Sequence, residues 1–153
     1  MGHADQVDFQ DRADAAAKLA PLVADAVGTA VADSLKPVTV VAKYPGGTII
    51  GEAVAAALDS TLLQLPSAAD VATLPLHSPA AHLVIVVDDG VETGRAAVGI
   101  GQAFRERKVG GLWLAVPVSP RQSEVVLDRV YDKVIAVVRP LARRSLRWHY
   151  REF

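Results

Sequence analysis

The chain of 153 residues has no cysteine, so neither a disulfide nor a thiolate metal site can form. Aromatic residues make up only 5% of it, so a core must be built mostly from alanine, valine and leucine. No apolar stretch reaches the roughly 18 residues of a membrane span, and we expect no membrane association. The formal net charge is −1, which disfavours binding to nucleic acid through bulk charge.

The length suits a single domain with one sizeable core. The polar, acidic N-terminus is unlike a secretory signal, and we expect a cytoplasmic protein. Residues 1–8 are expected to be disordered. Residues 140–153 are expected to form a tail rich in arginine and aromatic side chains.

One stretch combines a strand pattern with phosphate-binding chemistry. Leu83–Val87 is a run of five apolar residues, typical of a strand buried on both faces in a parallel sheet. Asp88 and Asp89 follow, then a turn bracketed by Gly90 and Gly94, then a predicted helix over residues 95–107. Unpaired N–H groups at the start of a helix bind phosphate, and glycines allow close approach. A P-loop is excluded because its Gly-Lys-Ser/Thr ending is absent.

A second stretch repeats this construction. Residues 38–42 predict a strand and residues 49–58 a helix. The connection between them is Lys43-Tyr44-Pro45-Gly46-Gly47. Two glycines before a helix expose backbone N–H groups at its positive end, although a plain tight turn would use the same residues.

Five predicted strands alternate with helices, which indicates an α/β fold with a doubly wound parallel sheet in a single domain. The other three strands are expected at residues 61–65, 112–117 and 133–138. Residues 9–33 are expected to form two short helices or one kinked at Pro21, and residues 124–131 a short helix. The strand order 2-1-3-4-5 would place both glycine turns in one crevice at the carboxyl ends of the strands.

The Asp-Asp-Gly-Val-Glu-Thr-Gly motif after an apolar strand resembles the ribose-5-phosphate loop of the type I phosphoribosyltransferase family. Residues 9–12 (Phe-Gln-Asp-Arg) resemble that family's lead helix, and Tyr150 with Phe153 its ending. The resemblance implies that Asp88 and Asp89 hold the ribose hydroxyls. It implies a ribose-phosphate loop made of Asp88, Asp89, Gly90, Val91, Glu92, Thr93, Gly94 and Arg95. It implies a pyrophosphate loop made of Lys43, Tyr44, Pro45, Gly46 and Gly47.

The reaction implied by this resemblance is transfer of a phosphoribosyl group from 5-phosphoribosyl 1-diphosphate (PRPP) to a nitrogenous base, with release of pyrophosphate and with Mg²⁺ as cofactor. Asp88, Asp89 and Glu92 are the catalytic candidates, and the metal ligands stay unassigned. Glu92 stands where the hypoxanthine–guanine branch has an aspartate facing the purine; an exposed, tolerated glutamate is the other reading. The strand at 112–117 lacks that branch's lysine, so the base is unassigned.

Two departures from the family pattern favour an alternative. Pro45 replaces the usual basic residue, and residues 66–82 are too short for the family's hood and flexible loop. A non-catalytic PRPP- or nucleotide-binding regulatory protein is therefore the second hypothesis, and a purely structural module the third. By the resemblance, the tail packs back on the sheet or lies beside the base site. The other interpretation is a solvated basic tail with aromatic anchors, or a subunit contact in a homo-oligomer.

Overall fold

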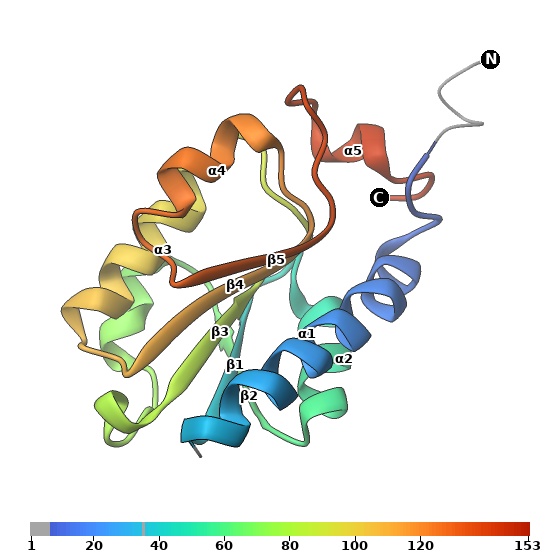
Figure 1. The fold of residues 1–153 in the computed structure, drawn as a ribbon. Coiled ribbons are helices and arrows are strands. Elements are labelled where there is room, and N and C mark those ends of the chain that lie inside the picture. The colour runs from blue at the N-terminus through green and yellow to red at the C-terminus, as the bar shows by residue number, and fades with distance from the viewer. Residues whose placement is uncertain (1–6, 35) are drawn as a thin grey trace.

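A computed structural model describes residues 7–34 and 36–153 and contains a parallel sheet in the order β2-β1-β3-β4-β5 (Figure 1). The strands are β1 (Val38–Lys43), β2 (Thr61–Leu65), β3 (Leu83–Val87), β4 (Gly111–Val118) and β5 (Lys133–Val138). The predicted doubly wound, single-domain α/β architecture is confirmed, and so is the strand order.

Helices cover both faces of the sheet (Figure 1). One face carries α1 (Arg12–Ser34) and α2 (Thr48–Leu58); the other carries α3 (Arg95–Glu106) and α4 (Arg121–Leu127). A short helix, α5 (Leu146–His149), lies beyond the carboxyl ends of the strands, near the N-terminal segment.

The buried strands divide their side chains between two cores. In β3, Leu83, Ile85 and Val87 pack toward α1 and α2, whereas Val84 and Val86 pack toward α3. All five are buried, as the uninterrupted apolar run predicts for a central parallel strand. The packing of β3 in both cores therefore fixes the position at which the following loop, Asp88–Gly94, begins.

Pro21 lies inside α1, which is one continuous helix. Proline removes one helical hydrogen bond and leaves the carbonyl of Ala17 without its usual partner. Both Ala17 and Pro21 are exposed, so water can bond that carbonyl. The sequence allowed two short helices or one kinked helix over residues 9–33, and the structure has one helix.

Residues 66–82 are ordered by short helices and buried leucines. Two 3₁₀ turns, η2 (Ala68–Thr73) and η3 (Pro79–Ala81), occupy most of this segment. Val71, Leu74 and Leu76 are buried in the core on the α3 side. Arg107 donates to the carbonyls of Val71 (2.7 Å) and Leu76 (2.9 Å), which fastens the segment to the end of α3.

The helix expected at residues 124–131 is displaced toward the N-terminus. It begins at Arg121, directly after Pro120, and ends at Leu127. Pro120 is the N-cap, with extended backbone, and it disfavours a helical conformation at Ser119 before it. The helix therefore begins directly after Pro120, three residues earlier than its apolar pattern indicates.

The two terminal segments pair with each other. Phe9 forms a parallel bridge with Tyr150, and the amide of Arg151 donates to the Phe9 carbonyl at 2.9 Å. Of residues 1–8, expected to be disordered, residues 1–6 lie outside the described residues, and Asp8 is hydrogen-bonded to His149. No helix within the described residues is long and apolar enough to cross a membrane.

Candidate functional site

The two glycine turns meet at the carboxyl edge of the sheet, because β1 and β3 are paired neighbours. A Cβ placed on Gly46 would lie 2.7 Å from Oδ2 of Asp89, and one on Gly47 would lie 2.7 Å from the Val87 carbonyl oxygen. The peptide bond between Tyr44 and Pro45 is cis. The absence of side chains at Gly46 and Gly47 is therefore what lets the turns touch.

Asp89 is buried, with 7% of its surface exposed, and its charge is compensated. Nε and an Nη of Arg12 donate to its Oδ2 at 3.1 and 3.0 Å. The hydroxyl of Tyr150 donates to its backbone carbonyl at 2.7 Å. Burial raises the pKa of that Tyr150 hydroxyl, with a further contribution from the nearby Asp89 charge, so the hydroxyl stays a donor. Asp89 is thus anchored from both ends of the chain.

Asp88 has the opposite surroundings. Burial, with the Asp89 charge as the second cause, raises the pKa of Asp88 to about 7. Its Oδ1 accepts a hydrogen bond from the Asp89 amide at 2.8 Å. Two adjacent carboxyl groups whose surroundings differ in this way are typical of functional sites.

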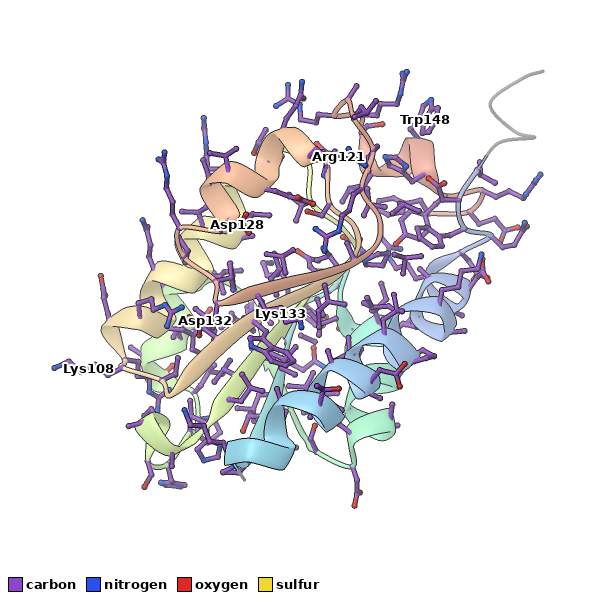
Figure 2. All side chains as sticks on the ribbon, in the orientation of Figure 1. Lys108, Arg121, Asp128, Asp132, Lys133 and Trp148 are labelled. Carbon is purple, nitrogen blue, oxygen red and sulfur yellow. The ribbon has the colours of Figure 1, made fainter. Side chains whose placement is uncertain are left out.

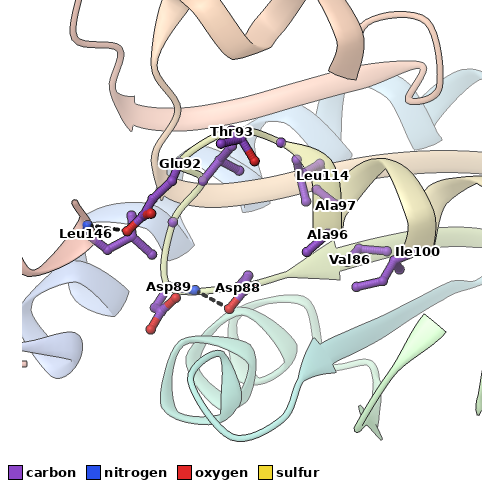
Figure 3. A pocket seen from close by; sticks show the side chains of 13 residues that line it. Val86, Asp88, Asp89, Glu92, Thr93, Ala96, Ala97, Ile100, Leu114 and Leu146 are labelled. Carbon is purple, nitrogen blue, oxygen red and sulfur yellow. Dashed lines mark hydrogen bonds between the residues drawn. The ribbon is translucent and has the colours of Figure 1, made fainter. Parts of the chain in front are cut away.

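A cavity of about 270 Å³ opens beside the loop that follows β3 (Figure 3). The side chains of Asp88, Asp89 and Glu92 lie on one side of it, and apolar side chains of β3, β4 and α3 lie on the other. The apolar lining side chains include Val86, Ala96, Ala97, Ile100 and Leu114. The whole predicted loop from Asp88 to Gly94 lines this cavity; Arg95, the first residue of α3, is exposed.

The loop offers backbone donors. Within the described residues, the amides of Gly90, Glu92, Thr93 and Gly94 donate to no other group, whereas that of Val91 donates to the Val118 carbonyl. Gly94 has φ = +89°, a conformation that glycine adopts readily. Amides in a loop at a helix N-terminus suit an anionic ligand.

In the turn after β1, two backbone amides donate to carbonyls of the same turn. The amide of Gly47 donates to the Lys43 carbonyl at 2.7 Å, and that of Thr48 to the Pro45 carbonyl at 3.2 Å. Nζ of Lys43 donates to the carbonyl of Tyr44, whose side chain is exposed. Lys43 is the cation of this turn, and Gly46 is its point of contact with Asp89.

Glu92 is fastened to the C-terminal tail. Its Oε1 accepts from the Leu146 amide at 2.8 Å, and its backbone carbonyl accepts from Oγ of Ser123 at 2.6 Å. Leu146 itself lines the cavity, as Figure 3 shows. The structure therefore brings Glu92 to the cavity but directs its carboxylate to α5.

The carboxylates fit a divalent cation that arrives with its ligand. Mg²⁺ is typically held by one or two carboxylates together with substrate phosphates and water. Asp88 supplies such a carboxylate at the cavity. Within the described part of the chain, no group of three or more histidine, aspartate or glutamate side chains could form a complete protein cage.

Neither His82 nor His149 lines the cavity. His82 pairs with Thr39, and His149 is buried and pairs with Asp8 at 2.7 Å. His3 lies outside the described residues.

Comparisons with known proteins identify a shared fold. No protein-family model and no curated protein matches this sequence. The crystal structure of TT1426 from Thermus thermophilus is similar over 96% of this chain and 92% of its own, with a TM-score of 0.75 at 18% identity. This likeness shows that the two chains share a fold.

Two crystal structures of a hypoxanthine phosphoribosyltransferase from Staphylococcus aureus are also similar to this chain. The first covers 90% of this chain and 73% of its own, with a TM-score of 0.49 at 14% identity. The second covers 79% and 74%, with a TM-score of 0.47 at 13% identity.

Arg12 and Leu146 are the site residues that sequence reasoning missed. Arg12 belongs to the Phe-Gln-Asp-Arg stretch that resembles a lead helix, but its partner Asp89 is 77 residues away. Leu146 follows a segment without periodicity. Only the fold brings these two residues to the loop.

Proposed function

We propose that this protein binds PRPP with Mg²⁺ and transfers the phosphoribosyl group to a nitrogenous base, releasing pyrophosphate. The observation that carries the proposal is the contact between the two glycine turns, where Gly46 lies against Asp89. A diphosphorylated sugar needs two phosphate-binding turns on one edge of a sheet. The unpaired loop amides beside Asp88 supply the chemistry for one of these phosphates.

In this proposal the loop amides and the carboxyl groups have separate roles. The amides of Gly90 and Glu92–Gly94 would bind the 5′-phosphate, and the Asp88 carboxyl would bond the ribose hydroxyls. The bond from C1 to the diphosphate oxygen breaks while a bond from the base nitrogen to C1 forms, and the proton of that nitrogen passes to the released pyrophosphate. Carboxylates beside the ribose stabilise the positive charge that develops at C1. Mg²⁺, held by Asp88 and the ligand's phosphates, would neutralise the leaving pyrophosphate.

We also propose a cytoplasmic location and a homo-oligomeric state. Assigning Glu92 to the acceptor base requires its carboxylate to leave the Leu146 amide. The identity of the base would then follow from a panel of purines and pyrimidines.

Isothermal titration of PRPP with and without Mg²⁺ tests the binding step. We expect Asp88→Asn to weaken binding at least about tenfold, because a carboxylate that holds both hydroxyls and metal is replaced by an amide. Asp128→Asn is the matched control. Asp128 follows the last residue of α4, is exposed, and does not line the cavity (Figure 2). Absence of heat with the wild-type protein, or equal binding by Asp88→Asn, contradicts the proposal.

A protein that binds PRPP or a nucleotide without turnover is the second candidate. The position of residues 66–82 favours this candidate. Arg107 and the buried side chains of Val71 and Leu76 hold this segment against α3, so it does not serve as a lid that closes over the cavity. Without closure, water competes with the acceptor. Release of pyrophosphate from PRPP in the presence of any base would exclude this candidate.

A further inference from the structure

The C-terminal segment touches the candidate loop at three successive points. Tyr150 bonds the Asp89 carbonyl, the Leu146 side chain packs on Gly90, and the Leu146 amide bonds Glu92. A Cβ on Gly90 would lie 2.4 Å from Cδ2 of Leu146, so this contact depends on glycine. We call residues 145–153 the strap.

The far end of the strap is also held. Arg12 donates to the Phe153 carbonyl at 3.1 Å and lies 4.0 Å from the centre of the Phe153 ring, while its other donors hold Asp89. Phe9 and Phe153 pack on the Tyr150 ring at centroid distances of 5.3 and 4.9 Å. The strap is therefore clamped over the N-terminal segment and the acidic loop together.

Glu92 is the point where the strap meets the cavity. Leu146 is the first residue of α5, and Ser145, which precedes it, makes no side-chain capping bond. The Glu92 carboxylate supplies a cap from 54 residues away. One hydrogen bond thus joins the ribose-phosphate loop to the wall formed by Leu146.

We propose that Glu92 is a positioning residue: through the Leu146 amide it fastens the strap, which completes the cavity wall and fixes the shape of the loop at residues 88–94. The ligand-binding part of this inference rests on the proposed function, whereas the fastening does not.

The fastening is tested without any ligand by amide hydrogen exchange. Glutamine keeps an oxygen that accepts from the Leu146 amide, so Glu92→Gln preserves the protection of that amide, whereas Glu92→Ala lowers it roughly two- to tenfold. The Val91 amide, which bonds the Val118 carbonyl, reports the shape of the loop and is deprotected by Glu92→Ala in parallel. If Glu92→Gln behaves like Glu92→Ala, or Val91 exchanges equally in both, the inference is wrong.

A matched pair at Leu146 tests the consequence for binding. Leu146→Ala and Leu146→Pro both remove the leucine side chain, but only proline removes the N–H, and proline is tolerated at the first position of a helix. We expect Leu146→Pro to bind PRPP with Mg²⁺ at least about threefold more weakly than Leu146→Ala. Equal affinities overturn the binding part.

The double variant Glu92→Ala/Leu146→Pro separates the fastening from general damage. Because both changes break one hydrogen bond, their effects on Val91 exchange should not add. Additive effects overturn the inference. If wild-type protein binds no PRPP, the proposed function fails, and the exchange experiments still decide the role of Glu92.

Discussion

Asp88 and Asp89 are neighbours in sequence but differ in how their charge is met. Asp89 is buried, and its Oδ2 accepts two hydrogen bonds from the guanidinium of Arg12. Asp88 is left with burial and a like charge, which raise its pKa to about 7. The motif predicts two equivalent acids. In the fold, Asp89 is fixed by Arg12, whereas the raised pKa of Asp88 makes its protonation sensitive to pH near 7.

This difference predicts a pH dependence of stability. Between pH of about 4 and 7 the folded protein binds more protons at Asp88 than the unfolded chain does, so the free energy of unfolding falls as pH rises and then levels off. Asp88→Asn lacks this loss. We expect its melting temperature to exceed the wild-type value by several degrees at pH 8, since about 1 kcal/mol corresponds to about 2–4 °C, and by little at pH 4.

Thermal melts at both pH values provide the measurement. Asp128→Asn, whose side chain is exposed, should give no such pH-dependent difference. A constant offset for Asp88→Asn at pH 4 and pH 8 would show that its titration does not limit stability.

The turns after β1 and β3 are the elements that build the site, and each depends on missing side chains. A Cβ on Gly47 would meet backbone oxygens of Val87 and Lys43 at 2.7 and 2.9 Å, and backbone cannot move aside cheaply. Gly28, in contrast, lies in α1 with open space around it.

Alanine substitutions at these two glycines should therefore have opposite signs. Gly47→Ala should lower the free energy of unfolding by about 1–3 kcal/mol through overpacking. Gly28→Ala should raise it by about 0.5–1 kcal/mol, because alanine is the better helix former. Urea unfolding of both variants measures this, and tolerance of Gly47→Ala would mean that the two turns are not in firm contact.

Sequence patterns predicted the strands more accurately than the start of α4 or the contacts around Asp89. Apolar runs predicted β2, β3 and β5 with their observed limits. In β3 the run reflects burial on both faces, whereas β2 and β5 are edge strands that are only partly buried. The start of α4 was misplaced because Pro120 sets it rather than the apolar pattern. The anchoring of Asp89 by Arg12 could not be predicted, since a pair 77 residues apart leaves no periodic signal.

The whole molecule is closed by contacts between its terminal segments, and Tyr150 is central to them. Its ring packs between Phe9 and Phe153 and its hydroxyl bonds the Asp89 carbonyl. Of the two readings of the tail, this packing supports the one in which the tail folds back on its own domain.

Tyr150→Phe should cost about 1–2 kcal/mol of stability, because the buried Asp89 carbonyl loses its donor. Asp132→Ala is the control: its carboxylate accepts from the Leu112 amide at 2.9 Å, and neither residue lines the cavity. Both variants should melt lower, but only Tyr150→Phe should also weaken the binding of PRPP with Mg²⁺. Equal weakening by Asp132→Ala would separate the Tyr150 contact from the site.

The clamp formed by Arg12, Tyr150 and Phe153 also bears on the order of folding. The contact from Arg12 to the Phe153 carbonyl joins residues that lie 141 positions apart, so closing it costs more chain entropy than forming local contacts. Contacts of such long sequence separation form slowly. We therefore expect the cavity wall at Leu146 to be completed after the sheet, once residues 145–153 have packed against the N-terminal segment.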